Sequence, residues 1–371
     1  MNDIYTQYYS NSRHDGYINV VPNCDGGLNW KKEFSGYAEK HLENRLILVS
    51  DERIIIDNMS EILCLDSKGN FLWKRDKWYG TQVIIRDKII YYTSSSRKDR
   101  MEAVTFDNNL VIEDFIIWEI VEGSYLQLFE PVRDELIAQV QYTGVQEASI
   151  DKFVIYKIGK KSLGYDWHKI FLKEASPLIP LVNFEKGFLL TATHSDVLIF
   201  DITKNKKEAE PQKTFPLPSL AGNVFVSSSK DGLIYFGYAE KDKVILKCYD
   251  QNGTELYKVE NQEEFVGYNK IIAPPILVND FIYLLTNHKL ICINNSKIQW
   301  VINSEGLPFS YATGLADNSI LVAQTSKLLN FSSEGKMKFS YDVKDTITAP
   351  PVLDKNGQIF FCKKSKLYSL K

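Results

Sequence analysis

Short apolar runs alternate with short polar turns along almost the whole chain. Runs such as Arg45–Val49, Ile54–Ile56 and Ile62–Leu65 span three to five residues and are separated by Asp, Asn, Ser and Gly. Runs of this length, rich in β-branched and aromatic residues, are typical of β-strands joined by tight turns. We therefore expect an all-β fold in which consecutive strands pair as hairpins.

A longer sequence motif recurs within this pattern. It consists of an apolar strand ending in an acidic or amide residue, then a turn with Gly, then a strand that carries an aromatic residue. The clearest copies are residues 62–73 and 246–257, and weaker copies begin at Leu290 and Leu328. A repeat that returns every ~40–50 residues indicates an array of small antiparallel sheets. The expected architecture is a β-propeller of four-stranded antiparallel blades.

The number of blades follows from the two ends of the chain. The last unit has three apolar runs, between residues 351 and 370, and the segment around Trp30 has the spacing of a fourth strand without three strands before it. Pairing that N-terminal strand with the C-terminal strands closes the ring and removes two exposed sheet edges. We expect eight blades, with seven as the alternative because the third and fourth units are irregular. Residues 1–26 lead into a single propeller domain, residues 27–371.

Composition narrows the class of protein. The 371 residues are 44% hydrophobic, with 44 Lys and Arg against 47 Asp and Glu. No basic stripe is present, which argues against a nucleic-acid partner. The N-terminus lacks the pattern of a secretory signal, and no apolar stretch approaches the length of a membrane span. We expect a cytoplasmic protein with no membrane partner, and a monomer, because a closed ring has no edges to protect.

The five cysteines predict no metal site. Cys64, Cys248 and Cys292 occupy the same position of the repeat, which predicts equivalent buried positions. A zinc site would require close pairs such as C-x-x-C, and none is present.

Three features of the sequence resemble the quinoprotein alcohol dehydrogenase-like propellers with pyrroloquinoline-quinone-type repeats. They are the motif at residues 63–73, the Ala-Pro-Pro sequences at 273–275 and 349–351, and the segment 13–17 followed by 28–30. The resemblance covers essentially the whole chain. Catalytic members of that family use adjacent cysteines and a calcium site near a catalytic Asp, and this chain has neither. The resemblance therefore implies the non-catalytic branch, with no cofactor.

Candidate catalytic residues are explained by turns. His194, Ser195 and Asp196 are consecutive, but they lie where a tight turn is expected, and neighbouring strand residues point to opposite faces. The acidic residues that recur in expected hairpin turns have the same explanation, because Asp and Asn cap their own backbone there. These residues are Asp51, Glu52, Asp87, Asp134, Asp231, Asp280 and Asp317. We assign no catalytic residue.

Aromatic residues recur between blades. A Tyr follows the outer strand of one blade and precedes or begins the next blade at five junctions, and a Trp adjoins one of them. Such residues could form an amphipathic collar around the axial opening, suited to a peptide or protein partner. Packing between adjacent blades explains the same recurrence, so both interpretations stay open. The candidate collar consists of Tyr37, Trp78, Tyr79, Tyr125, Tyr268 and Tyr311.

We expect a non-enzymatic binding or scaffold propeller that presents a loop face and an axial funnel to a protein or peptide partner. The alternative is a hydrolase or lyase acting on a sugar or peptide in the funnel, which requires polar side chains such as His41, Glu43 and Glu122 to converge there. A purely structural subunit of a larger assembly is the third possibility.

Overall fold

The computed structural model is built from strands. It describes residues 16–33, 46–50, 52–58, 60–77, 83–86, 88–95, 100–106, 111–116, 125–132, 135–142, 152–159, 168–172, 181–183, 185–193, 195–201, 203, 210–218, 224–240, 243–262, 270–363 and 366–371. Within these residues every regular element is a β-strand. None of the described residues forms a helix that could cross a membrane.

The strands form eight antiparallel sheets, which we number 1 to 8 along the chain. Sheet 1 contains β3 (Leu46–Ser50), β4 (Arg53–Asp57), β5 (Glu61–Asp66) and β6 (Phe71–Asp76), and sheet 2 contains β7 (Ile84–Arg86), β8 (Ile89–Thr93), β9 (Arg100–Thr105) and β10 (Val111–Ile116). Sheet 3 contains β11 (Tyr125–Val132), β12 (Glu135–Tyr142), β13 (Lys152–Gly159) and β14 (His168–Leu172), and sheet 4 contains β15 (Leu181–Asn183), β16 (Phe188–Ala192), β17 (Asp196–Asp201) and β18 (Lys213–Pro216).

Sheet 5 contains β19 (Phe225–Ser228), β20 (Ile234–Glu240), β21 (Lys243–Tyr249) and β22 (Glu255–Gln262), and sheet 6 contains β23 (Ile276–Val278), β24 (Phe281–Leu285), β25 (Lys289–Asn294) and β26 (Lys297–Asn303). Sheet 7 contains β27 (Phe309–Leu315), β28 (Ile320–Gln324), β29 (Lys327–Phe331) and β30 (Met337–Asp342). Sheet 8 contains β31 (Val352–Leu353), β32 (Ile359–Lys363), β33 (Lys366–Leu370) and the N-terminal β2 (Leu28–Glu33). Sheet 7 also carries β1 (Tyr17–Ile18), which pairs in parallel with β27.

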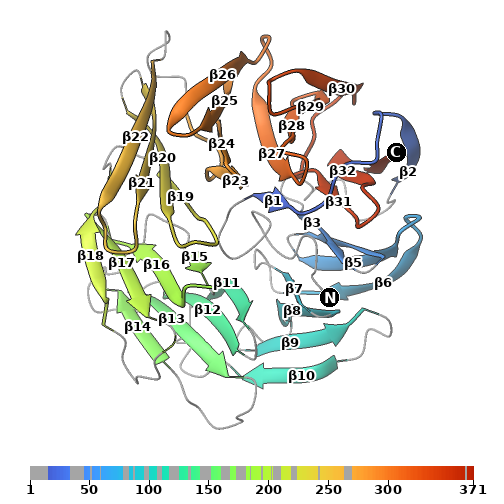
Figure 1. Ribbon diagram of the computed structural model, residues 1–371. Coiled ribbons are helices and arrows are strands. Elements are labelled where there is room, and N and C mark those ends of the chain that lie inside the picture. Colours follow the sequence, from blue (N-terminus) through green and yellow to red (C-terminus); the bar gives the residue numbers. More distant parts are fainter. Residues whose placement is uncertain are drawn as a thin grey trace.

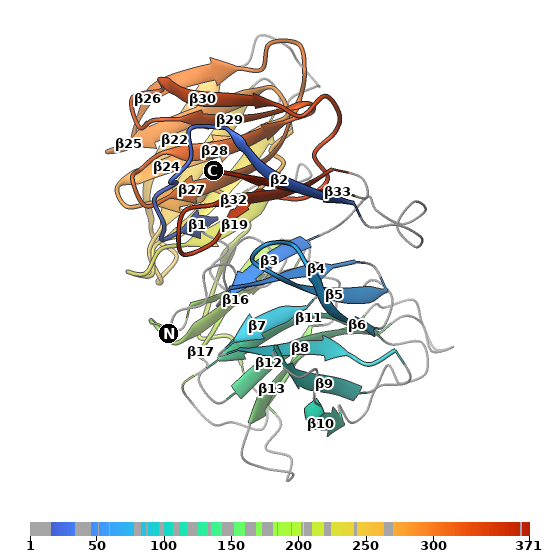
Figure 2. The ribbon, with the colours of Figure 1, turned by 90° about the vertical axis from the view of Figure 1, so that its right-hand side faces the viewer.

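The sheets are arranged around a common axis, with the first strand of each sheet towards the centre and the fourth at the rim (Figure 1). Strand β2 lies along β33 (Figure 2), and the N–H of Lys371 donates to the carbonyl of Gly27. Sheet 8 therefore takes its outer strand from the N-terminal part of the chain. In each sheet the first and third strands run in one direction, and the second and fourth strands run in the opposite direction. We call the side where the first and third strands end the hairpin face, and the side where the second and fourth strands end the connection face.

The hydrophobic core lies in the seams between neighbouring sheets. One cluster joins residues of sheets 7, 8, 1 and 2, and three others join sheets 4 and 5, 5 and 6, and 6 and 7. Second and third strands are apolar on both faces, as in β24, where Ile282–Leu285 are all buried. This explains why their runs in the sequence are continuously apolar rather than alternating.

The recurring Asp–Gly–aromatic motif joins neighbouring sheets at four seams in the described part of the chain. In sheet 1, Asp66 accepts N–H groups of Lys68 and Asn70 and so caps the turn, while Gly69 adopts a φ of 76°. A β-carbon at Gly69 would lie 2.7 Å from the ring of Trp30 in sheet 8, so only Gly allows this approach. The same contact recurs at three further seams, with Phe215 on Gly253, Trp300 on Gly335 and Phe339 on Gly26.

Indole hydrogen bonds join sheets 1 and 2 and also sheets 6 and 7. Trp73 Nε1 donates to the carbonyl of Phe106 at 2.8 Å, and Trp300 Nε1 donates to that of Ser333 at 2.7 Å. Each aromatic residue thus binds the turn between the third and fourth strands of the following sheet.

The Ala-Pro-Pro sequences also lie in seams. Ser227 Oγ of sheet 5 donates to the carbonyl of Pro275 at 2.5 Å, and Thr313 Oγ1 of sheet 7 donates to that of Pro351 at 2.8 Å. Both hydroxyl-bearing residues are buried. The second Pro of each sequence therefore offers a carbonyl to the preceding sheet at the point where the next sheet begins.

Candidate functional site

The sequence-predicted collar falls mostly outside the described residues. Tyr37, Trp78, Tyr79 and Tyr268 are not among them, and only the backbone of Tyr125, the first residue of β11, is described. Tyr311 lies in the inner strand β27, where its partly buried ring packs against the cluster of sheets 7, 8, 1 and 2. Tyr311 is therefore the one candidate collar residue whose side-chain surroundings are described. Its packing against neighbouring sheets is what the alternative interpretation, packing between adjacent blades, predicts. The collar stays a prediction.

The polar residues that a hydrolase or lyase site in the funnel would require are also not described. His41, Glu43 and Glu122 all lie outside the described residues.

On the connection face, the turn after β24 and the connection from β26 to β27 lie next to each other. The turn after β24 is held by Thr286, whose Oγ1 accepts the N–H groups of His288 and Lys289. His288 Nδ1 lies 3.2 Å from Ser304 Oγ, in the connection that leads to β27. That connection also presents Leu307, with 38% of its surface exposed, and Gln324 Nε2 donates to the carbonyl of Leu307. The backbone at this junction is thus fixed by the adjacent turns, and an apolar side chain projects from it.

The ion pair with the most deeply buried lysine lies between sheets 1 and 2. Lys77 Nζ is 3.1 Å from Asp57 Oδ1, the side chains are 1% and 8% exposed, and the N–H of Val83 donates to Asp57 Oδ2. Burial raises the pKa of Asp57, although Lys77 and the Val83 N–H favour the carboxylate. Lys77 also forms a β-bridge to Ser94. The pair links the end of sheet 1 to sheet 2 and has no access to a ligand from solvent.

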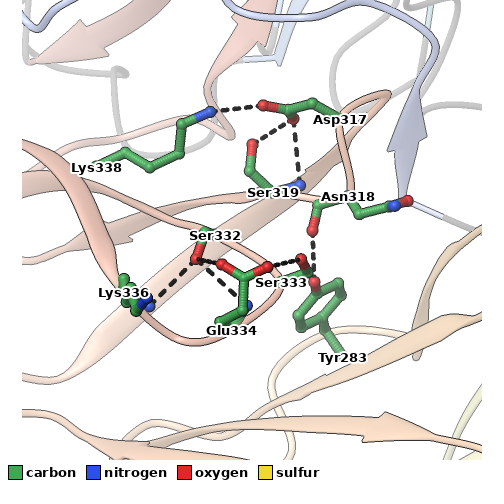
Figure 3. Close-up of polar contacts among 9 residues, drawn as sticks. All are labelled: Tyr283, Asp317, Asn318, Ser319, Ser332, Ser333, Glu334, Lys336 and Lys338. Carbon is green, nitrogen blue, oxygen red and sulfur yellow. Dashed lines mark hydrogen bonds and ion pairs between the residues drawn. The ribbon is translucent and has the colours of Figure 1, made fainter.

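The hairpin face carries a polar cluster on sheet 7 (Figure 3). Asp317 accepts hydrogen bonds from Lys338 Nζ at 2.6 Å and from the N–H and hydroxyl of Ser319. Burial opposes ionisation of Asp317, but these donors outweigh it and lower the pKa of the carboxyl group. Tyr283 of sheet 6 donates its hydroxyl hydrogen to the carbonyl of Asn318 at 2.7 Å, which joins the two sheets.

The neighbouring turn, between β29 and β30, is capped by Ser332. Ser332 Oγ donates to Glu334 and accepts the N–H groups of Glu334 and Lys336 (Figure 3). These contacts cap turns and tie sheets together, and they do not direct reactive groups at one point.

Other polar residues of the described turns have similar roles. Thr193 Oγ1 accepts the N–H groups of Ser195 and Asp196, so these two residues form a capped turn as the sequence indicated.

Asn183 donates to Ser228 Oγ and the carbonyl of Ser229, and Asn279 donates to Asn318 Oδ1. Turns of adjacent sheets are thus hydrogen-bonded to each other on the hairpin face.

Cys64, Cys248, Cys292 and Cys362 lie inside the sheets, whereas Cys24 lies in the segment between β1 and β2. Cys64, Cys248 and Cys292 are fully buried, and each is directly opposite an aromatic residue of the fourth strand: Trp73, Tyr257 and Trp300. Burial raises the pKa of Cys248 to about 11 and that of Cys292 to about 12, so these thiols stay protonated at neutral pH. Among the described residues, no three His, Cys, Asp or Glu side chains gather as a metal site would require.

Sequence reasoning missed the segment that crosses the hairpin face. Residues 16–27 run from β1, beside the axis, across the turns of sheets 7 and 8 to β2 at the rim (Figure 1). The N–H of Ala316 donates to the carbonyl of Val20, and the N–H of Asn23 donates to that of Gly357. A two-residue parallel strand leaves no periodic signal in the sequence, which explains why it was not foreseen.

Comparisons with known proteins agree with this architecture. No protein-family model and no curated protein sequence matches the chain. A solved structure described as KlHsv2 with loop 6CD replaced by a Gly-Ser linker is similar to it, with a TM-score of 0.51 and 10% identity over 81% of this chain and 100% of that one. The fold is a β-propeller.

Two further solved structures align less well. The WD40 β-propeller domain of Doa1 has a TM-score of 0.48 and 9% identity over 93% of this chain and 98% of that one. Raptor of Chaetomium thermophilum has a TM-score of 0.48 and 9% identity over 76% of this chain and 27% of that one. At such identities the likeness concerns the fold alone, because one propeller scaffold supports many functions.

Proposed function

We propose that this chain is a non-enzymatic binding module, a closed eight-bladed propeller that presents its connection face and axial funnel to a protein or peptide partner. In this proposal each of the eight sheets is one blade, and the pairing of β2 with β33 closes the ring. The collar of Tyr37, Trp78, Tyr79, Tyr125, Tyr268 and Tyr311 contributes the aromatic contacts.

The observation that carries the proposal is an exposed apolar side chain on the connection face, Leu307, whose backbone carbonyl accepts a hydrogen bond from Gln324. On the hairpin face, described turns bond to each other, and residues 16–27 cover the turns of sheets 7 and 8. Polar groups there are already engaged within the chain, so a partner would have to displace them. On the connection face, Leu307 is 38% exposed, and its carbonyl is bonded to Gln324 of β28. Exposed apolar side chains on a fixed backbone are suited to partner binding.

The positions of the perturbed groups support a non-enzymatic role. Asp57, Cys248 and Cys292, whose pKa values are raised by burial, lie inside sheets or between them. A catalytic group needs access to substrate as well as a shifted pKa. These groups are used for packing and for ties between sheets.

The seam contacts support the closed ring and the resemblance to quinoprotein-type repeats. Phe339 of sheet 7 packs on Gly26, and Trp30 of sheet 8 packs on Gly69 of sheet 1. The aromatic–glycine contact that joins sheets elsewhere thus also occurs on both sides of the sheet that contains the two ends. A propeller closed in this way has no unpaired blade, which supports the expectation of a monomer.

The experiment is affinity capture from native soluble lysate. It compares the wild-type protein with a Tyr79→Ala/Tyr125→Ala/Tyr268→Ala variant and with a control, Phe71→Ala/Met337→Ala, which removes two exposed apolar side chains of the rim. Thermal melts check that all three fold. We expect a partner that the wild type and the control retain and the collar variant loses. Retention of the same proteins by all three, or of none by any, contradicts the proposal.

A further inference from the structure

The axial end of the hairpin face contains a peptide-like segment already bound to a sheet edge. Strand β1 adds in parallel to the inner edge of β27, with Tyr17 opposite Gly314 and Ile18 opposite Leu315. The N–H of Gly314 donates to the carbonyl of Gly16 at 2.9 Å, and that of Ala316 donates to the carbonyl of Val20 at 3.2 Å. The central position of β1 is visible in Figure 1. Edge addition of this kind is a common way for proteins to bind extended peptides.

The two side chains of β1 point into two different apolar clusters. Ile18 is fully buried in the cluster of sheets 7, 8, 1 and 2. Tyr17 packs, partly buried, against the cluster of sheets 6 and 7. Successive residues of a strand point to opposite sides, so a peptide on this edge places an aromatic side chain against one cluster and a large aliphatic side chain in the other.

Glycine is required in the peptide and in the edge that binds it. A β-carbon at Gly16 would lie 2.9 Å from Ile276 of sheet 6, and Gly16 has a φ of 65°. A β-carbon at Gly314 would lie 2.2 Å from Val278 of the same sheet. The inner strand of sheet 6 therefore closes one side of the groove so tightly that the peptide must have Gly before its aromatic residue.

The segment is held at several points: Val20 and Cys24 pack, partly buried, against the same cluster as Ile18, and the N–H of Asn23 donates to the carbonyl of Gly357. Asn19 is exposed, and Val21 is 54% exposed, so Ile18 is the one fully buried side chain between residues 16 and 23. The segment continues into β2, which is part of sheet 8, and this tether keeps it at a high effective concentration near the groove. A free peptide of equal intrinsic affinity therefore binds well only when the tethered segment is weakened.

We propose that the inner edge of β27 is a binding site for an extended peptide of the pattern Gly–aromatic–large aliphatic, and that residues 16–20 occupy it as an autoinhibitory segment. This inference goes beyond the proposed function, because it adds a second site at the hairpin-face end of β27, at Gly314 and Leu315, whereas Tyr311 lies nearer the connection-face end of that strand. A partner protein gains access when it presents such a peptide and outcompetes the chain's own copy.

The test uses a fluorescein-labelled peptide with the sequence of residues 16–23, Gly-Tyr-Ile-Asn-Val-Val-Pro-Asn. Its binding is measured by fluorescence anisotropy to the full-length wild type and to the Ile18→Asp variant, which places a charge in the apolar pocket and weakens the tethered segment. We expect the variant to bind the peptide at least ten-fold more tightly than the wild type does. Two control peptides, with Asp for Ile or Val for Gly, should lose binding, because one places a charge in the pocket and the other meets Ile276.

A second protein keeps the test valid if Ile18→Asp does not fold. It has the wild-type groove and a protease site in place of residues 23–25, and it is cleaved after folding. Exchange of the released segment for the labelled peptide, seen by native mass spectrometry, supports the proposal. Equal peptide binding by wild type and folded Ile18→Asp, binding of the control peptides, or a cleaved segment that never exchanges overturns it. The connection-face proposal is tested separately by the collar variant, so the two can fail independently.

Discussion

Asn330 offers a direct test of how the repeat stabilises each seam. It occupies the position in β29 that Cys64, Cys248 and Cys292 occupy in sheets 1, 5 and 6, and it lies opposite Phe339 as those cysteines lie opposite their aromatic residues. Asn330 is 0% exposed, and neither its Nδ2 nor its Oδ1 makes a hydrogen bond to the residues that the structure describes. We predict that Asn330→Cys stabilises the protein.

The magnitude follows from the cost of the buried amide. A polar group buried without a partner costs about 1–3 kcal/mol, and a protonated Cys side chain behaves as a small hydrophobe. Because Cys already fits this position in three other sheets, little strain is expected. The free energy of unfolding should therefore rise by about 1–3 kcal/mol.

Urea unfolding under reducing conditions measures this change, with the slope of the transition compared between variants. Asn29→Cys is the matched control, because Asn29 is exposed in β2, and its effect should stay within about 0.5 kcal/mol. A loss of more than about 1 kcal/mol in Asn330→Cys would refute the reasoning, since it would show that the amide makes a contact worth more than its desolvation.

Three further predictions concern other seams and turns. Thr313→Val keeps the shape of the side chain but leaves the buried carbonyl of Pro351 without its donor, so urea unfolding should show a loss of about 1–3 kcal/mol, and an unchanged stability would contradict this. Trp300→Phe removes the 2.7 Å bond to Ser333 and should cost about 1 kcal/mol in the same assay, whereas a gain would argue against the indole contact. The lowered pKa of Asp317 means that its carboxylate stabilises the fold above the ordinary pKa of 3.8 and that this contribution is lost as pH falls through the folded-state value. Asp317→Asn should therefore reduce the difference in unfolding free energy between pH 6 and pH 2.5, by less than about 1 kcal/mol because the ion pair is partly exposed, and an identical pH dependence in both proteins would disprove the assignment.

The repeat was readable from the sequence because its causes are local. Asp66 caps its own turn, and Gly69 adopts a left-handed φ within that turn, so both residues recur wherever the turn recurs. The equivalence of Cys64, Cys248 and Cys292 was likewise visible as a spacing, and all three are buried. Periodic burial and turn geometry act over a few residues, which is the range that a pattern in the sequence can report.

The partners of those residues were not readable. Nothing near Gly69 in the sequence indicates that it accepts the ring of Trp30, and nothing near Asp57 indicates that it pairs with Lys77. The Ala-Pro-Pro sequences were noticed as a resemblance, but their role as acceptors for Ser227 and Thr313 needs two sheets side by side. For the candidate collar, Tyr311 is placed by its packing, and the other five side chains stay predictions from spacing.

The sequence by itself therefore determined the strands, the turns and the repetition of one small sheet, because hydrophobic periodicity, capping and glycine conformation are properties of neighbouring residues. The sequence also predicted that the strand around Trp30 completes sheet 8, and β2 does pair with β33. The tertiary structure decided which sheet each aromatic residue binds and that residues 16–20 lie along the inner edge of β27. Those outcomes depend on surfaces brought together across tens to hundreds of residues. Their free energy comes from shape and hydrogen bonding between sheets, which no single segment specifies alone.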